Sequence, residues 1–302
     1  MRVVIIGGKG LIGGALSKEL IAHGHQVTIL SRGEGKDRAD SVVQQRWDGK
    51  DSAQLAVFLE GQDAVVNLAG ESIGKSRWTS ERKQLIRNSR IQVGKSLVDA
   101  ITSLPVKPQV LIQASAIGYY GTGSGSCDEN TPQGNDWLAN VCADWENSLS
   151  GVRDTGIRLV TIRSGVVLAR EGGVLAQLEL PVRLFVGGPI GSGKQWISWI
   201  TLTDEVRAIR FLIERNDCKG TFNLTAPDPV SNRKMGKTLA KVLHRPFWFP
   251  LPAFALRLLL GEMSTLVLDG QEVLPVGLLK AGFKFEFSNL EPALRDLYPK
   301  AP

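Results

Sequence analysis

Apolar runs alternate with amphipathic segments along the first half of the chain. Runs typical of buried strands lie at Arg2–Ile6, Val27–Leu30, Val42–Arg46, Ala64–Leu68, Val110–Ala114 and Leu159–Ile162. Segments with a helical spacing of apolar residues lie between them, at Leu11–His23, Ser52–Leu59, Thr79–Thr102 and Trp137–Leu149. This alternation predicts an α/β fold, a doubly wound parallel sheet with helices on both faces.

The pattern changes after Arg163. Glycine clusters interrupt it between residues 172 and 193, and then Trp196–Leu202 has the character of a strand and Asp204–Glu214 that of a helix. From Ala226 onward, prolines and aromatic residues mix with short helical segments. We therefore expect residues 1–165 and 194–225 to form the domain with the sheet, and residues 166–193 and 226–302 to form a small mixed lobe on the substrate side.

The first strand runs directly into a glycine-rich turn that opens a helix. The turn contains Gly7, Gly10, Leu11, Ile12 and Gly13. Gly7 allows a tight turn, Gly10 lets the backbone approach a pyrophosphate, and Gly13 lets the helix pack close to the sheet. The first N–H groups of the helix then point at the phosphates. A glycine turn alone is often only structural, but strand, glycines and helix in this order predict a dinucleotide-binding Rossmann domain.

The end of the second strand predicts which dinucleotide is bound. Ser31 and Arg32 stand where a protein that prefers NAD carries an acidic residue for the ribose hydroxyls. An arginine suits a 2′-phosphate, and the Ser31 hydroxyl adds a donor. We expect NADP(H), although Arg32 as an ordinary loop cation is the alternative. Asp48, after the third strand, is a candidate for the adenine amino group or a turn residue before Gly49.

Small and hydroxyl-bearing residues follow the fourth and fifth strands. Leu68, Ala69 and Gly70 offer little side chain where the middle of a dinucleotide passes, and Ser115 comes with Tyr119 and Tyr120 at the next strand end. The carboxyl ends of parallel strands are where open α/β folds bind ligands. Ser115 is therefore a candidate for cofactor binding, and Ser115, Tyr119 and Tyr120 are candidates for catalysis.

These motifs together resemble the extended short-chain dehydrogenase/reductases. The likeness rests on the glycine turn, Asn67–Gly70, Ser115 with Tyr120-Gly121, and Trp199-Ile200 followed by Asp204. More narrowly, the chain is similar to the atypical "epimerase family" group with a DUF1731 C-terminal region. Further matches are Asn67–Glu71, Arg77-Trp78, Ser89-Arg90, Arg163–Leu168, Gly187–Gly193, Gln195, Arg245-Pro246, Leu259–Glu262 and Gly270-Gln271. The resemblance spans essentially the whole chain and implies cofactor binding.

Further charged and aromatic side chains are candidates for the site. Glu71 and Arg90 are expected on the cofactor side, Glu71 with a possible role as a general base and Arg90 as an anion anchor. The candidates for the substrate side are Arg77, Trp78, Arg163, Gln195 and Trp199. The alternative for each is ordinary, because arginines are usually solvated and tryptophans usually belong to the core.

The chain departs from the family pattern at the usual catalytic pair. Extended members carry Tyr-x-x-x-Lys, in which the tyrosine moves a proton and the lysine lowers its pKa and holds the nicotinamide ribose. In these members an acidic residue follows the lysine by one helical turn, and Glu146 matches that residue. Counted back from Glu146, Leu138 stands at the tyrosine position and Cys142 at the lysine position. We expect Cys142 to lie near the cofactor as a protonated, inert thiol among apolar neighbours.

Two functions follow from this departure. One is an NADP(H)-dependent oxidoreductase or nucleotide-sugar-epimerase-like enzyme that uses Ser115 with Tyr119 or Tyr120. The other is a non-catalytic NADPH-binding regulator or an assembly or cell-division factor that acts through a protein partner. The sequence names neither the small-molecule substrate nor the partner.

Composition narrows the remaining classes. The 302 residues carry 36 basic and 30 acidic side chains, and the net charge of +6 is not gathered in long basic blocks. We therefore expect no nucleic-acid partner. The three cysteines and three histidines are too few and too scattered for a disulfide framework or a metal site. We expect a monomer or homodimer in a reducing compartment.

The start of the chain and its late apolar stretch bear on location. The first strand begins at the N-terminus, so we expect no signal peptide and a place in the cytoplasm, or in the plastid stroma for an organellar protein. Residues 247–260 are apolar but contain Pro250, Pro252 and Arg257. They fall short of a membrane span. We expect a helix packed over the cleft there, with a surface for a partner or a membrane as the alternative.

Overall fold

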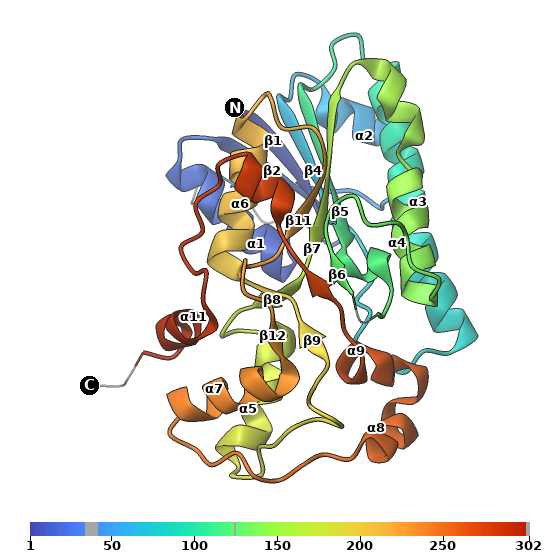
Figure 1. Cartoon of the computed structure of the whole chain (residues 1–302). Helices are drawn as coiled ribbons and strands as arrows, with labels where there is room; N and C mark the ends of the chain where they lie inside the picture. Colours follow the sequence, from blue (N-terminus) through green and yellow to red (C-terminus); the bar gives the residue numbers. More distant parts are fainter. Residues whose placement is uncertain (34–41, 124, 300–302) are drawn as a thin grey trace.

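The computed structural model describes residues 1–33, 42–123 and 125–299. Within these residues, seven parallel strands form one sheet in the order β11-β7-β5-β4-β1-β2-β3 (Figure 1). The strands are β1 (Arg2–Ile6), β2 (Gln26–Ser31), β3 (Val42–Arg46), β4 (Ala64–Asn67), β5 (Val110–Ala116), β7 (Arg158–Ser164) and β11 (Gly220–Leu224). The predicted doubly wound α/β fold is confirmed.

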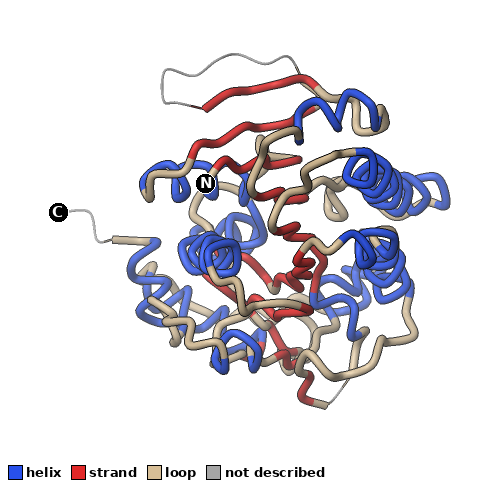
Figure 2. Tube along the Cα trace, turned by 90° about the horizontal axis from the view of Figure 1, so that it is seen from above, coloured by secondary structure: helices blue, strands red, loops and turns tan. Residues whose placement is uncertain are grey.

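Helices cover both faces of this sheet, as the view from above shows (Figure 2). One face carries α1 (Leu11–Ala22) and α6 (Leu202–Glu214), and the other carries α2 (Ser52–Leu59), α3 (Ser80–Ser103) and α4 (Trp137–Asn147). Because both faces are covered, the central strands are apolar on both sides, which explains their continuous apolar runs.

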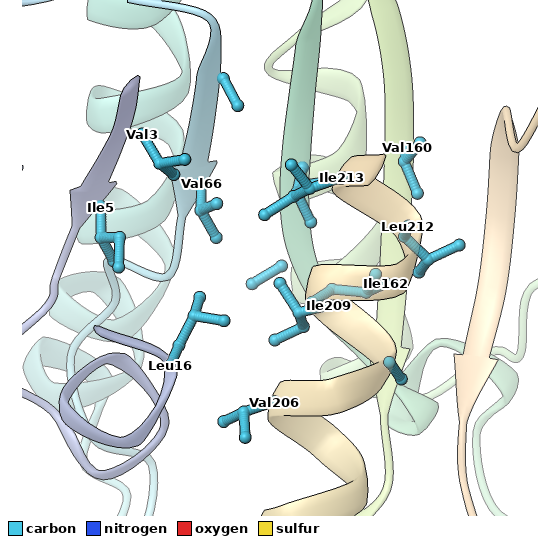
Figure 3. Close-up of a cluster of buried hydrophobic side chains, with 14 of the residues drawn as sticks. Val3, Ile5, Leu16, Val66, Val160, Ile162, Val206, Ile209, Leu212 and Ile213 are labelled. Carbon is cyan, nitrogen blue, oxygen red and sulfur yellow. The ribbon is translucent and has the colours of Figure 1, made fainter. Parts of the chain in front are cut away.

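Alternate residues of each central strand belong to two separate cores. Val3, Ile5 and Val66 pack with α1 and α6, and Figure 3 shows this cluster with Leu16 and Ile209. The residues between them, including Val4, Ile6 and Val65, pack against α2 and α3 on the other face. The glycine turn and the loops after the strands therefore stand on a rigid support.

Two sequence predictions differ from the structure here. The segment Trp196–Leu202 is not one strand, because it divides into β9 (Trp196–Ile197) and β10 (Trp199–Thr201), which pair with short strands outside the main sheet. The edge strand β11 was not predicted. Its sequence, Gly-Thr-Phe-Asn-Leu, lacks a continuous apolar run, because the buried Asn223 makes a polar contact with Tyr120.

The C-terminal lobe has its own apolar core. Its elements are β8 (Val166–Leu168), α5 (Gly173–Arg183), β12 (Val230–Ser231), α7 (Asn232–Val242), α8 (Ala253–Leu260), α9 (Thr265–Leu268) and α11 (Leu290–Leu297). The short helix α10 (Val276–Lys280) packs on the sheet domain instead, since Leu278 belongs to the core that contains α6. The short strand β13 (Glu272–Val273) pairs with β6 (Ser126–Cys127), which ties the lobe to the sheet domain. Trp199, predicted within the sheet domain, packs in the core of the lobe.

The apolar segment at residues 247–260 does not pack as predicted. No residue of α8, all of which is described, is buried, and Phe254 and Leu258 are 72% and 76% exposed. The expected packed helix is therefore wrong, since its apolar side chains face outward. Among the described residues, no helix has the length and hydropathy that crossing a membrane requires.

One acidic side chain is buried beneath the carboxyl edge of the sheet. Glu205, in the first turn of α6, is fully buried. Its Oε1 accepts a hydrogen bond of 2.6 Å from the Ser164 hydroxyl, and its Oε2 has no partner within the described part of the chain. Burial raises the pKa of Glu205 to about 8, so the folded protein holds this carboxyl in its neutral form at neutral pH.

We predict that Glu205→Gln stabilises the protein by an amount that grows with pH. Between its ordinary pKa of 4.5 and about 8, the folded state holds a proton on Glu205 that the unfolded state releases, so the contribution of this group to stability falls as pH rises. Glutamine has no such proton, and the gap should widen by about 1.4 kcal/mol per pH unit. Urea unfolding of both proteins at several pH values between 5 and 8 measures this. A gap that does not change with pH contradicts the burial of a neutral acid.

We also predict opposite effects of alanine at two adjacent glycines of α1. A Cβ at Gly13 would lie 2.6 Å from Gly8 Cα and 2.8 Å from Gly7 O, and backbone atoms cannot give way. A Cβ at Gly14 meets only Gly8 O, at 3.9 Å. Gly13→Ala should destabilise the protein by roughly 1–3 kcal/mol, and Gly14→Ala should stabilise it by up to about 1 kcal/mol. Equal unfolding free energies for the two variants contradict this packing.

Candidate functional site

The glycine turn after β1 leaves the start of α1 open to an anion. Gly7 has φ +82°, and a Cβ there would lie 3.0 Å from the backbone of Leu68 and Ala69. The turn therefore lies directly against the segment that follows β4. Gly10 is the N-cap of α1 and no described side chain caps the helix, so its first N–H groups are available to a phosphate. Leu11 is partly exposed there and Ile12 half-buried.

The residues after β2 and β3 differ in what they offer a ligand. The side chain of Arg32 is 76% exposed, and among the described residues it makes a loose ion pair of 3.6 Å with Glu71. Ser31 is half-buried, and its hydroxyl donates to Gly33 O at 3.4 Å. Asp48 accepts hydrogen bonds from the backbone of Lys50 and Asp51, which lower its pKa. Asp48 is thus a turn residue, the alternative that the sequence left open, while the Arg32 guanidinium is exposed at the surface.

Glu71 is held by cations and is not placed as a general base. Arg82 donates a hydrogen bond of 3.0 Å to its Oε1, and this contact lowers the pKa of Glu71. The Glu71 N–H donates to the Ser89 hydroxyl. The paired guanidinium stabilises the charged carboxylate, which weakens Glu71 as a general base, the role that the sequence suggested for it. Arg82 was not singled out from the sequence.

Ser115 and Tyr120 belong to a buried polar network centred on an ion pair. Arg163, almost fully buried, donates from Nε and Nη2 to the two carboxylate oxygens of Glu146, each at 2.9 Å. Ser115 Oγ donates to the same carboxylate at 2.7 Å. Arg163 Nη1 donates to the Tyr120 hydroxyl at 3.1 Å, and Tyr120 donates to Asn223 Oδ1 at 2.6 Å. The network joins α4 to β5, β7 and β11.

This network removes Tyr120 from the candidates for proton transfer. Burial raises the pKa of Tyr120 to about 12, and its hydroxyl already has a donor and an acceptor. Arg163 is likewise a structural partner of Glu146 and not a substrate anchor, since its guanidinium is used on three sides. The sequence singled out Ser115 and Tyr120 as catalytic candidates and Arg163 as a substrate-side candidate, but it did not reveal that they share one hydrogen-bond network.

Tyr119 lies on the other side of the same guanidinium. Arg163 Cζ stands 3.3 Å from the centre of the Tyr119 ring, a cation–π contact. The ring borders a polar cavity of about 260 Å³, with Glu146 and Arg163 also in its wall. Within the described residues, no protein group bonds to the Tyr119 hydroxyl. Of the two adjacent tyrosines, Tyr119 is therefore the one whose phenol is free.

The two positions of the missing catalytic pair hold an apolar residue, Leu138, and a buried thiol, Cys142. Leu138 and Cys142 lie on α4 beside Gly118, and a Cβ at Gly118 would be 3.6 Å from both side chains. Cys142 is buried, and burial followed by the nearby Glu146 raises its pKa to about 12. The structure agrees with an inert thiol at this position.

The substrate-side candidates divide into two groups. Arg77 lies against Gly261 of the lobe, and the Trp78 ring packs on Trp137 with centroids 4.6 Å apart. These side chains lie where the sheet domain meets the lobe, beside an ion pair between Lys83 and Glu262.

Gln195 and Trp199 both hold parts of the lobe together through their side-chain nitrogens. Gln195 Nε2 donates to the backbone of Ile190 and Val267. Trp199 is 0% exposed, and its indole donates to Asp228 O. Trp199 therefore belongs to the core of the lobe, which corrects the expectation that it forms a substrate wall. The Oε1 of Gln195 has no hydrogen-bond partner within the described residues, so its role at the site stays a prediction. Among the described residues, no three His, Cys, Asp or Glu side chains gather as a metal site requires.

Comparisons with known proteins agree with this architecture. Residues 3–143 match the NAD dependent epimerase/dehydratase family, and residues 251–297 match a domain of unknown function, DUF1731. The "Epimerase family protein SDR39U1 homolog, chloroplastic" of Arabidopsis thaliana is 42% identical, over 98% of this chain and 86% of its own. Epimerase family protein YfhF of Bacillus subtilis is 39% identical over 98% of both chains.

Solved structures show the same fold. Human epimerase family protein SDR39U1 (isoform 2), solved with NADPH, is 32% identical, and each chain is fully covered with a TM-score of 0.89. UDP-glucose 4-epimerase of Thermus thermophilus, solved with NAD, has a TM-score of 0.76 over both full chains at 18% identity, a likeness of fold alone. Because the Arabidopsis relative is 42% identical over 98% of this chain, the chain belongs to the epimerase family of NAD-dependent epimerase/dehydratase proteins that includes the SDR39U1 homologues.

Proposed function

We propose that the chain binds NADP(H) along the carboxyl edge of its sheet, as an atypical oxidoreductase or epimerase-like member of its family. The observation that carries this proposal is the exposed Arg32 guanidinium at the end of β2, beside an uncapped helix N-terminus at Gly10. The two features together suit a ligand with a pyrophosphate and a second phosphate on the adenine side. The NADPH in the structure of the human relative supports the same assignment.

The residues present fit each part of this cofactor. The N–H groups at the start of α1 are suited to the pyrophosphate. Arg32 and Ser31 are suited to the 2′-phosphate, for which Arg32 would exchange its loose contact with Glu71. The backbone of Leu68 and Ala69 lies against the turn, and Gly70, which follows them, has no side chain. When bound, NADPH supplies a hydride, while these residues bind and orient it.

We predict that NADPH binds more tightly than NADH and that Arg32→Ala narrows the gap. A charge-assisted contact to the 2′-phosphate at this exposed position should be worth about a tenfold difference in Kd. Calorimetric titration of both cofactors into the wild type and the variant measures this. Arg87→Ala, at an exposed position on α3, is the control and should change neither affinity. Equal affinity of the wild type for the two cofactors contradicts the NADP(H) assignment.

A second candidate function, an NADPH-binding protein that acts through a protein partner, is favoured by the state of the catalytic positions. Leu138 has no titratable group, and the pKa values of Cys142 and Tyr120 are both raised to about 12. Ser115 is bonded to Glu146. Tyr119 alone among the predicted catalytic residues has a free hydroxyl, so an active enzyme would depend on it.

The two functions predict different outcomes in a panel of carbonyl compounds and nucleotide sugars. An enzyme consumes NADPH or converts a sugar, and Tyr119→Phe should lower that rate by about a hundredfold or more. Tyr120→Phe should mainly lower the stability. A binding protein leaves every compound and the NADPH absorbance unchanged. Turnover that survives Tyr119→Phe unchanged contradicts the role given to this phenol.

A further inference from the structure

Helix α4 lacks the cation that its family places at the lysine position, but a cation reaches the same region from α3. Arg90 of α3 and Cys142 of α4 are close enough for each to influence the pKa of the other. Burial lowers the pKa of Arg90, yet a guanidinium stays charged at neutral pH. A positive charge therefore lies beside the thiol that occupies the lysine position.

Packing fixes the orientation of this guanidinium. Arg90 Nη1 donates to Glu71 O at 3.1 Å and to Ile86 O at 2.8 Å. The guanidinium carbon is 4.7 Å from the centre of the Trp145 ring, and a Cβ at Gly70 would lie 3.0 Å from it. One nitrogen is therefore anchored, one face lies on an aromatic ring, and the group rests against the bare backbone of Gly70.

The rest of the guanidinium is left for a ligand. Within the described residues, Arg90 Nε and Nη2 have no hydrogen-bond acceptor. Neither atom is among the fully buried polar atoms without a partner, so both remain accessible. An arginine with a half-used fork suits phosphate oxygens or ribose hydroxyls. No second role is evident for these donors, because the carboxylate of nearby Glu71 is bonded to Arg82 instead.

The position of Arg90 falls on the path from the glycine turn to the end of β5. Gly7 lies against Leu68 and Ala69, and the next residue, Gly70, lies against Arg90. Arg90 and Cys142 influence the pKa of each other, and Ser115 and the backbone of Ala116 also lower the pKa of the Cys142 thiol, so all of these groups lie in one region. If the pyrophosphate of a dinucleotide lies on the glycine turn and its nicotinamide end lies near Ser115, the part between them passes Arg90.

We propose that Arg90 replaces the missing lysine as the cationic anchor of the nicotinamide-side ribose, through the N–H groups of Nε and Nη2. This inference rests on the proposed NADP(H) binding and adds which part of the cofactor the residue contacts. The guanidinium is fixed between Gly70 and Trp145, while Tyr120 is bonded to Arg163 and Asn223 elsewhere. Arg90 therefore anchors the cofactor but does not lower the pKa of a catalytic tyrosine. It takes over the binding role of the family's lysine and not its catalytic role.

Three ligands of increasing length test this contact by calorimetry. Adenosine 2′,5′-bisphosphate ends before the second ribose, 2′-phospho-ADP-ribose includes that ribose, and NADPH adds the nicotinamide. Arg90→Met should weaken the two longer ligands about ten- to hundredfold. It should change the bisphosphate by less than about twofold. Arg90→Lys, which keeps the charge without the fork, should fall between the wild type and the methionine variant for the two longer ligands.

The control is Arg87→Met, one turn earlier on α3, where the arginine pairs with exposed Asp144. It should change none of the three affinities, and thermal melts check that every variant is folded. An equal loss for all three ligands assigns Arg90 a merely structural role and overturns the inference, while NADP(H) binding by the wild type still stands. An affinity of Arg90→Met for NADPH equal to that of the wild type also overturns it. A wild type that binds none of the ligands overturns the proposed function itself.

Discussion

The ion pair between Glu146 and Arg163 is the interaction on which the rest of the site depends. It joins α4 to β7, and through Ser115, Tyr120 and Asn223 it reaches β5 and the edge strand β11. Arg163 is almost fully buried, so loss of Glu146 would leave an unpaired charge in the interior at a cost of roughly 3–5 kcal/mol. The pair therefore sets the position of α4 and of the ends of β5, β7 and β11.

The same pair explains why the hydroxyls of two predicted catalytic residues are already hydrogen-bonded within the protein. The hydroxyls of Ser115 and Tyr120 satisfy the remaining hydrogen-bonding capacity of the buried carboxylate and guanidinium. With Leu138 and Cys142 on the facing side of α4, the usual acid/base positions carry no group that exchanges a proton near neutral pH. What remains open is the backbone of the glycine turn and the cations Arg32 and Arg90. The chain thus retains the features that hold a dinucleotide, and Tyr119 is the one free phenol among the predicted catalytic residues.

Periodicity predicted the sheet and the glycine turn because both depend on local residues. Continuous apolar runs such as Val3–Ile6 have one explanation, a strand covered on two faces, and Gly7, Gly10 and Gly13 follow the first of them at fixed spacing. The edge strand β11 was missed because Asn223 breaks its apolar pattern to bond Tyr120. No local signal distinguishes Trp199, a core residue, from an exposed tryptophan.

Contacts between distant segments account for the other differences. The roles of Ser115 and Arg163 depend on Glu146, and the pKa of Glu205 depends on how fully α6 covers it. Gln195 is committed to Ile190 and Val267, which lies 72 residues away. The sequence identified Ser115, Arg163 and Gln195 as polar candidates and did not identify Glu205. In each case tertiary packing, which the sequence pattern does not show, decides the partner of the side chain.

The central claim is that this site binds NADP(H) without freeing its buried polar network. A crystal structure of the chain with NADPH tests the claim most directly. The account predicts the pyrophosphate on the N–H groups after Gly10, the 2′-phosphate within hydrogen-bond distance of Arg32, and the Glu146–Arg163 pair intact with Tyr120 still bonded to Asn223. A cofactor bound elsewhere, or a broken pair with Tyr120 turned toward the nicotinamide, would contradict it.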